Sequence, residues 1–215
     1  MAIRYTRREE QLNAWSHGAG IVLAAGVAVW WSVCGVWHRD AYTVWGILLF
    51  LVGILFSYGA STLYHSTSFR SRWREMLRRL DHAAIYWSIA GSYSPITLIA
   101  LRTEAGWGWG LFLFIWISAI SGTIVSFFHL REHSHIETLC YVGMGLSVLV
   151  AFKPLMETVS AATIAWIVAE GVAYITGAFF YSFNKRRYNH TVFHFFVLLG
   201  TFCHVLAVWE ILGIP

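Results

Sequence analysis

Charged residues are scarce in this chain of 215 residues, where Lys, Arg, Asp and Glu together make up 12%. A soluble domain carries about 25%, so the composition excludes a soluble protein with a charged surface facing water on all sides. Apolar residues reach 58%, the mean hydropathy is +0.59, and 12 Trp, 10 Tyr and 15 Phe contribute. The composition predicts an all-α membrane protein that forms a single domain over residues 1–215, with no soluble module.

Cysteine is also rare, and Cys34, Cys140 and Cys203 all fall inside apolar runs. They lack zinc-finger spacing and form no evident disulfide framework, so we interpret them as small apolar fillers. No small-residue cleavage site follows the first apolar stretch, which is therefore predicted to be a retained helix rather than a signal peptide. The modest net charge of +4 does not indicate nucleic acid as a partner.

Long apolar runs are the main feature that is present, and a membrane span needs about 20 such residues. The runs are continuous rather than alternating, which favours helices over a β-barrel. The predicted spans are 17–37, 43–64, 82–101, 107–128, 138–153, 160–182 and 191–213.

The basic residues are distributed unevenly between the predicted spans, and cytoplasmic loops are the ones enriched in Lys and Arg. One set of connections holds twelve: Arg4, Arg7, Arg8, Arg70, Arg72, Arg74, Arg78, Arg79, Arg131, Lys185, Arg186 and Arg187. The other set holds Arg39, Arg102 and Lys153. This bias predicts a seven-transmembrane helix bundle with a cytoplasmic N-terminus, an outside C-terminus and anionic lipid headgroups at its cytoplasmic face. Within the longest connection, residues 71–80 are expected to form an amphipathic helix lying flat on those headgroups.

Polar residues gather at the predicted cytoplasmic ends of three spans. Ser61 and His65 close one span, Asp81 opens the next, and His190 and His194 open the last. Residues four apart share a helix face, so each of the two pairs points in one direction. Three imidazoles plus a water form a recurring catalytic zinc set, with Asp81 suited to handle a proton and Ser61 to donate a hydrogen bond.

Each of these residues also has a simpler interpretation. The histidines can be interfacial hydrogen-bonding groups, Asp81 a helix N-cap, and Ser61 a small packing residue. Their shared depth and spacing favour the metal site over these separate roles.

Several other polar residues have weaker cases. Glu10 and His17 flank the first span and either support the site or reach the interface. His82 points about 100° away from Asp81 on a helix, which makes it a poorer candidate ligand. His204 lies about 15 Å along its helix from His194, too far to share the metal. Glu170 falls near mid-membrane, where it is either protonated or paired with a partner that the sequence does not name.

Four motifs then carry a resemblance that covers nearly the whole chain. They are residues 10–17 (EQLNAWSH), 61–65 (STLYH), 81–95 (DHAAIY followed by AGSYSP) and 189–194 (NHTVFH). In this order the chain resembles the bacterial hemolysin III proteins, the prokaryotic branch of the progestin and adipoQ receptor family that includes the adiponectin receptors.

This resemblance implies that His65, His190 and His194 coordinate zinc in the cytoplasmic half of the bundle, with Asp81 and Ser61 facing a zinc-bound water. It implies a place in the bacterial plasma membrane and kinship with membrane hydrolases that cleave lipid amides such as ceramide. Bacterial members are also linked to hemolysis and membrane-lipid homeostasis. The chain lacks the receptors' long N-terminal domain and extended C-terminus, so no protein hormone is expected as a partner.

Three functions remain open at this stage. The first is zinc-dependent hydrolysis of an amide or ester bond in a membrane lipid, with a lipid or fatty acid bound in the bundle. The second is a non-enzymatic lipid sensor or receptor with structural zinc. The third is cytolysis, which continuous spans and the absence of an export signal make a secondary effect.

Overall fold

The computed structural model describes residues 5–128, 135–183 and 186–214, and these residues form helices joined by short connections. Short 3₁₀ segments occur at Val36–His38 and Ser147–Ala151, and a π-helix occupies Ile96–Ala100. The α-helices are α1 (Arg7–Val33), α2 (Ala41–Ser66), α3 (Arg74–Pro95), α4 (Trp107–Phe128), α5 (His135–Leu146), α6 (Phe152–Thr158), α7 (Ala161–Ser182) and α8 (Asn189–Leu212). The predicted all-α class is confirmed.

Six of the helical stretches are long and apolar enough to cross a membrane, which supports a multi-pass bundle. They are Arg7–Val33, Ala41–Ser66, Trp107–Phe128, Ile136–Thr158, Ala161–Ser182 and Asn189–Leu212. The predicted span 82–101 coincides with most of α3 and the following π-helix, but α3 is not apolar enough over a sufficient length to count among these six stretches. Its helix begins with the strongly basic residues 74–79, which lower the apolar character of the element.

Residues 71–80 do not form the separate interfacial helix that we predicted. Arg74 is already the first residue of α3, which runs without interruption to Pro95. The amphipathic spacing of Met76, Leu77 and Leu80 continues directly into the buried Ala83 and Ala84, so one helix accommodates both segments. The basic residues therefore occupy the first turns of a bundle helix.

Two other helix boundaries differ from the predicted spans because polar residues lie inside helices. α1 begins ten residues before the predicted start, with Thr6 as N-cap in a capping box with Glu9. The fifth span is longer than 138–153, because α5 continues through the 3₁₀ segment into α6 and ends at Thr158.

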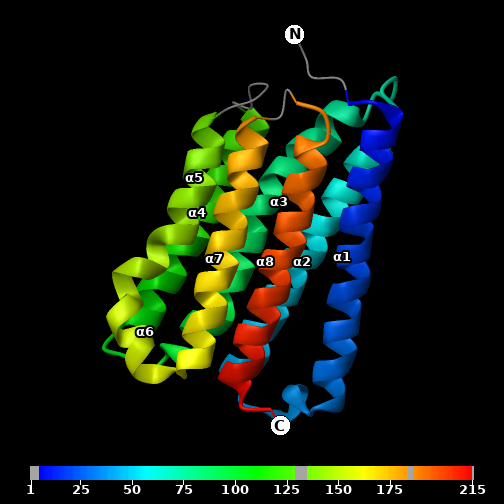
Figure 1. Cartoon of the computed structure of the whole chain (residues 1–215). Helices are drawn as coiled ribbons and strands as arrows, with labels where there is room; N and C mark the ends of the chain where they lie inside the picture. Colours follow the sequence, from blue (N-terminus) through cyan, green and yellow to red (C-terminus); the bar gives the residue numbers. More distant parts are fainter. Residues whose placement is uncertain (1–4, 129–134, 184–185, 215) are drawn as a thin grey trace.

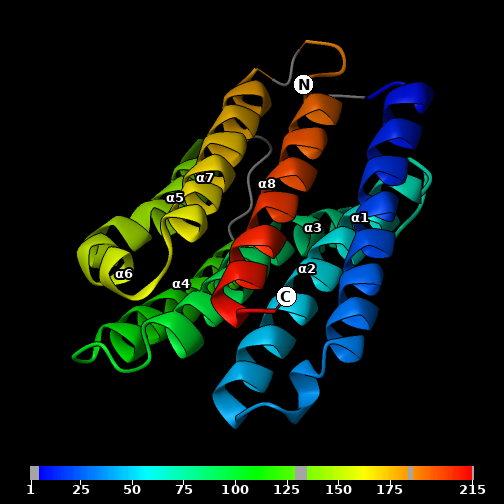
Figure 2. The ribbon, with the colours of Figure 1, turned by 60° about the horizontal axis from the view of Figure 1, so that its bottom comes forward.

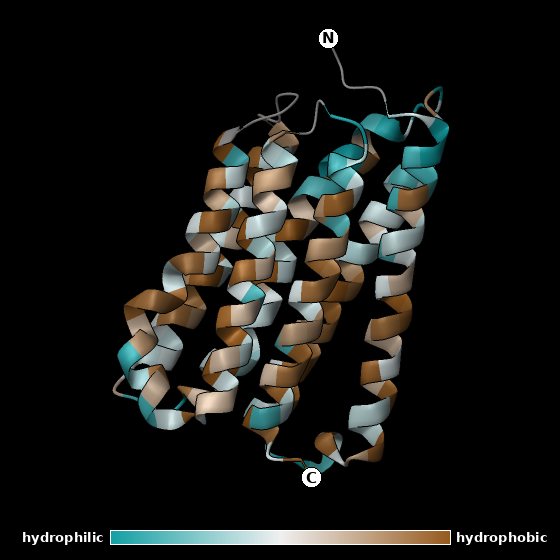
Figure 3. Cartoon of the chain, in the orientation of Figure 1, coloured by the Kyte–Doolittle hydropathy of each residue, from teal (hydrophilic) through white to brown (hydrophobic). Residues whose placement is uncertain are grey.

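The helices alternate in direction, so the N- and C-terminal ends of the described chain lie at opposite ends of the bundle (Figure 1). We call the end at which α1, α3, α5 and α8 begin the histidine end, and the opposite one the far end. α8 passes between α7 and α1, as a second view also shows (Figure 2). Hydrophilic residues concentrate at the histidine end, while apolar residues dominate the length of the helices (Figure 3).

α2 and α3 approach each other through glycine. A Cβ at Gly53 would lie 2.6 Å from the carbonyl oxygen of Trp87, and one at Gly91 would lie 2.8 Å from that of Leu49. Small residues permit such backbone contact between membrane helices. This contact holds the middle of α2, the helix that carries His65, against the second half of α3.

Candidate metal centre

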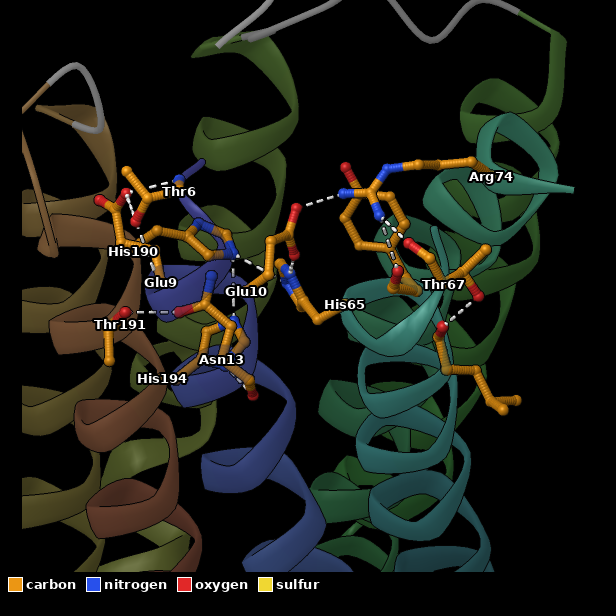
Figure 4. A network of polar contacts seen from close by, with 12 residues as sticks. Thr6, Glu9, Glu10, Asn13, His65, Thr67, Arg74, His190, Thr191 and His194 are labelled. Carbon is orange, nitrogen blue, oxygen red and sulfur yellow. Dashed lines mark hydrogen bonds and ion pairs between the residues drawn. The ribbon is translucent and has the colours of Figure 1, made fainter. Parts of the chain in front are cut away.

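Three buried histidines meet at the histidine end of the bundle. His65 lies in the last turn of α2, while His190 and His194 lie in the first two turns of α8. Their exposed fractions are 3%, 9% and 1% respectively. Figure 4 shows the three rings converging from the two helices, with residues of α1 beside them.

The ring nitrogens of these histidines lie close enough to share one ion. His190 Nε2 is 3.2 Å from His65 Nε2 and 3.1 Å from His194 Nε2. One ligand atom from each of the three lies within 4.8 Å of the others. Among the described residues, these three histidines are the group whose side chains lie close enough together to bind one metal ion.

The hydrogen-bond partners of the other ring nitrogens determine where the protons are. His65 Nδ1 is 2.6 Å from Glu10 Oε2, a carboxylate oxygen that accepts, so Nδ1 donates and Nε2 carries a lone pair. His194 Nδ1 faces the Asn13 carbonyl at 3.2 Å and Ser16 Oγ at 3.1 Å. Because Ser16 donates its own proton to that carbonyl, at 2.8 Å, His194 Nδ1 must be the donor.

His65 and His194 therefore both direct an Nε2 lone pair towards His190. His190 Nε2 carries at most one proton while neutral and cannot donate fully to both neighbours. A metal ion accepts all three lone pairs at once. For Zn–N bonds of 2.0–2.1 Å, a tetrahedral site separates its nitrogens by about 3.3 Å, close to the two contacts in this structure. The donor set and its spacing fit zinc.

A carboxylate and an arginine extend the site from His65 outwards. Glu10 accepts from His65 with one oxygen and from Arg74 with the other. Arg74 also donates to the carbonyl oxygens of Tyr64 and Thr67 at the end of α2. A carboxylate that accepts from a ligating histidine fixes the tautomer and orientation of the ring, and Glu10 has that geometry (Figure 4).

Hydrogen bonds join α1 to the start of α8. Glu9 Oε1 accepts from the backbone N–H of Tyr188 at 2.9 Å, and Thr191 donates to Asn13 Oδ1 at 2.5 Å. Tyr188 has a φ of 63°, a conformation that costs a residue with a side chain about 1–2 kcal/mol. The contacts from α1 hold this turn and thereby set the position of His190.

Aromatic rings surround the three histidines. The His17 ring stacks on His194 with 3.7 Å between centroids and 9° between planes. The Tyr5 ring lies 4.9 Å from that of His190. Burial raises the pKa of the Tyr5 hydroxyl, and the negative charges of Glu10 and Asp81 raise it further. Tyr5 therefore stays neutral and able to donate a hydrogen bond beside the site.

The remaining predicted residues are placed less directly. Ser61 lies one turn before His65, and its Oγ is buried with no hydrogen-bond partner among the described residues. Asp81 is half-buried on α3 and outside the three-histidine group, although its charge reaches Tyr5. His82 belongs elsewhere, because its Nδ1 pairs with Glu137 of α5 at 3.1 Å.

Several residues of the site were not singled out from the sequence. Asn13 and Ser16 lie in the 10–17 motif, and Thr191 lies between the two histidines of α8. An i, i+3 polar stripe from Glu10 through Asn13 and Ser16 on α1 was a usable signal. Arg74 carried no signal, because it is one of many basic residues in its segment.

Similarity to known proteins identifies the family of this chain. The family described as Haemolysin-III related matches residues 5–205. The chain belongs to the haemolysin-III-related family. This confirms the predicted resemblance, and the family is part of the progestin and adipoQ receptor group.

The relatives cover most of the haemolysin-III-related chain. Hemolysin-3 of Bacillus cereus is 37% identical over 199 residues, which are 90% of this chain and 87% of the relative. The Hemolysin-3 homolog of Bacillus subtilis (strain 168) is 31% identical over 197 residues, 92% and 91% of the two chains. The human Monocyte to macrophage differentiation factor is 27% identical over 184 residues, 82% and 72%. The chain is thus a haemolysin-III-type integral membrane protein whose buried histidines could hold a metal ion.

Proposed function

We propose that this chain is a zinc-dependent hydrolase of amide or ester bonds in membrane lipids. The observation that carries the proposal is the convergence of three Nε2 atoms, two of which are held as lone pairs by Glu10, Asn13 and Ser16. A set of three histidines leaves a fourth position of a tetrahedral ion open, as catalytic zinc sites do. A structural site would close that position with a fourth protein ligand.

We further propose seven spans in the bacterial plasma membrane, with α3 and its π-helix as the third span and the histidine end in the cytoplasm. Basic residues support this orientation. Those described at the histidine end are Arg7, Arg8, Arg70, Arg72, Arg74, Arg78, Arg79, Arg186 and Arg187. Those at the far end are Arg39, Arg102 and Lys153. Arg4, Arg131 and Lys185, which the sequence prediction also counted, lie outside the described residues.

In the proposed reaction, zinc supplies Lewis-acid chemistry that polarises the scissile carbonyl and makes water a better nucleophile. Asp81 accepts a proton from the attacking water and returns it to the leaving nitrogen or oxygen as its bond to carbon breaks. Ser61, whose buried hydroxyl is uncommitted, donates a hydrogen bond to the carbonyl oxygen as it gains charge. Glu10 keeps the His65 ring in place throughout.

The proposed ligand is a membrane lipid or fatty acid whose polar group reaches the histidine end. The basic residues there suit anionic lipid headgroups. Neither nucleic acid nor a protein hormone is proposed as a partner. Cytolysis remains the less supported proposal, because it requires the apolar helices to leave one membrane and enter another.

Lipid mass spectrometry on the purified full chain in nanodiscs tests the proposal. We expect zinc-dependent release of fatty acid from N-acyl or O-acyl lipids, lost on chelation and restored by zinc. Asp81→Asn should abolish release while keeping the metal, and Asp40→Asn at the far end is the matched control. Bound zinc with no product from any lipid class would overturn the hydrolase and leave the lipid sensor with structural zinc.

A further inference from the structure

A second pair of ionisable residues lies deep in the bundle, away from the three histidines. Glu170 of α7 and His204 of α8 face each other, with Oε2 2.8 Å from Nδ1. Their exposed fractions are 9% and 0%. Both lie near the middle of helices that are apolar enough to span the membrane, where such residues are costly and usually functional.

The pair is not fully explained as a clamp between α7 and α8. A carboxylate and an imidazole satisfy each other through one nitrogen, yet His204 Nε2 is buried without a hydrogen-bond partner among the described residues. The ring of Phe50 packs on His204 with centroids 4.7 Å apart. Leaving a buried polar atom unpaired costs about 1–3 kcal/mol. If the pair only joined α7 to α8, this cost would bring no stability in return.

The titratable groups around the pair do not supply a compensating cation. Glu170 interacts electrostatically with Tyr174 on its own helix, Cys203 on α8 and Tyr93 on α3. Tyr58 of α2 interacts electrostatically with Tyr174. These neighbours are tyrosines and a cysteine, which carry no positive charge in any protonation state. Among the described residues, His204 is the ion-pair partner of Glu170.

A layer of hydroxyl groups lies one helical turn from the pair, towards the histidine end. Tyr58 donates to Thr201 Oγ1 at 2.6 Å, and the Tyr174 hydroxyl lies 3.2 Å from the same oxygen. Tyr174 is four residues after Glu170 and Thr201 is three before His204, so both share a helix face with the pair.

Glycines lock these tyrosine rings in place. A Cβ at Gly200 would lie 2.4 Å from the Tyr174 ring, and one at Gly20 would lie 2.8 Å from the Tyr58 ring. The hydroxyls are therefore held towards Thr201. On its other side Tyr58 packs against His17, with 5.1 Å between ring centroids, and His17 stacks on His194.

We propose that Glu170 and His204 form an intramembrane proton-binding site that exchanges protons through the Tyr58–Thr201–Tyr174 hydroxyl layer. A proton that arrives at His204 Nε2 leaves the Nδ1···Oε2 hydrogen bond in place and changes the pair from a net charge of −1 to neutral. Its departure reverses the change. Hydroxyls both donate and accept, so the layer can pass a proton in either direction once side-chain motion brings a hydroxyl to His204 Nε2, which none of them contacts in this structure. Chains of acidic residues and histidines inside membrane bundles serve this purpose. The site depends on neither zinc nor hydrolysis.

Time-resolved infrared spectroscopy after a pH jump tests the site in the full chain in nanodiscs, with isotope-labelled Glu and His. Glu170→Gln and His204→Gln assign the signals of the pair, with Glu210→Gln and His38→Gln as exposed controls. The blocking variant is Thr201→Val, which removes the hydroxyl and keeps the shape. Its matched control is Thr176→Val, because the Thr176 hydroxyl donates to Val172 within its own helix.

We expect the carboxyl and imidazole signals to change together after the pH jump. Thr201→Val should slow the response by about tenfold or more, the size of one lost hydrogen-bonding group, while Thr176→Val responds at the wild-type rate. An unchanging pair, or a wild-type rate in Thr201→Val, would overturn the proposal. If an assignment variant does not fold, solid-state NMR coupling between the labelled carboxyl carbon and ring nitrogen identifies the pair in the wild-type and Thr201→Val proteins.

Discussion

The two ends of the bundle use charged residues in opposite ways. At the histidine end, the Arg74–Glu10 pair has side chains 14% and 7% exposed, and Glu10 also binds His65. At the far end, the Arg102–Asp40 pair lies 41% and 54% exposed. A buried pair loses several kcal/mol when one partner is removed, whereas an exposed pair contributes about 0–1 kcal/mol. Burial, rather than the presence of ion pairs, distinguishes a constructed site from a solvated surface.

The largest contrast between the ends should appear in metal binding. His194→Ala removes one of the three converging nitrogens, and we expect it to lose nearly all bound zinc. His38→Ala, an exposed histidine at the far end, should keep it. Elemental analysis of purified protein at equal zinc exposure measures both. Full zinc occupancy in His194→Ala would show that the metal binds elsewhere.

The contribution of the buried carboxylate should be smaller but clear. Glu10→Gln keeps the size of the side chain but replaces the carboxylate with a neutral amide. The hydrogen bond to His65 Nδ1 weakens, so zinc affinity should fall by about 10–100-fold. Competition with a metal chelator measures the change, and Glu210→Gln at the far end is the control. Equal affinity in the two variants would remove Glu10 from the support of the site.

Packing between α2 and α3 should matter to the histidine end through the backbone. Gly91→Ala places a methyl group against the Leu49 carbonyl and should destabilise the protein by about 1–3 kcal/mol. Gly59→Ala, which meets nothing within 4 Å, is the matched control. Thermal unfolding in detergent compares them, and identical midpoints would contradict the close approach of the helices.

The smallest effect is expected at the far end. The Thr43 hydroxyl, helped by backbone N–H groups and the Arg102 charge, holds the pKa of Asp40 below its ordinary 3.8. A carboxyl with a lowered folded pKa stabilises above its unfolded pKa and loses this contribution as the pH falls through the folded value. Exposure limits the contribution to less than about 1 kcal/mol. Thermal unfolding of Asp40→Asn and wild type should therefore differ slightly at pH 7 and converge as the pH falls through the folded pKa of Asp40.

Much of this arrangement was accessible from the sequence. Apolar run lengths located most of each helix, and the spacings from Ser61 to His65 and from His190 to His194 assigned side chains to helix faces. Alternating helix direction then brought α2 and α8 together at one end. What failed was the treatment of polar residues as boundaries. α1 starts at Arg7 and α3 at Arg74 because the polar faces of these turns point at each other rather than at lipid.

Pairings between helices were beyond the sequence alone. Glu170 was expected to be either protonated or partnered, and His204 was judged only by its distance from the predicted metal site. Their contact depends on how α7 and α8 are rotated against each other, which packing at Gly200 and Gly177 determines. The bond between Glu10 and Arg74 likewise needs α1 and α3 at one depth.

The two helices that carry the histidines are separated along the chain by five others, and α1 supplies the residues that orient them. During synthesis, α1 and α2 enter the membrane long before α8. The three histidines of the candidate metal centre therefore cannot come together until α8 has been inserted beside them. A nascent or truncated protein that lacks α8 keeps only His65 of the three, so zinc loading would report that insertion is finished.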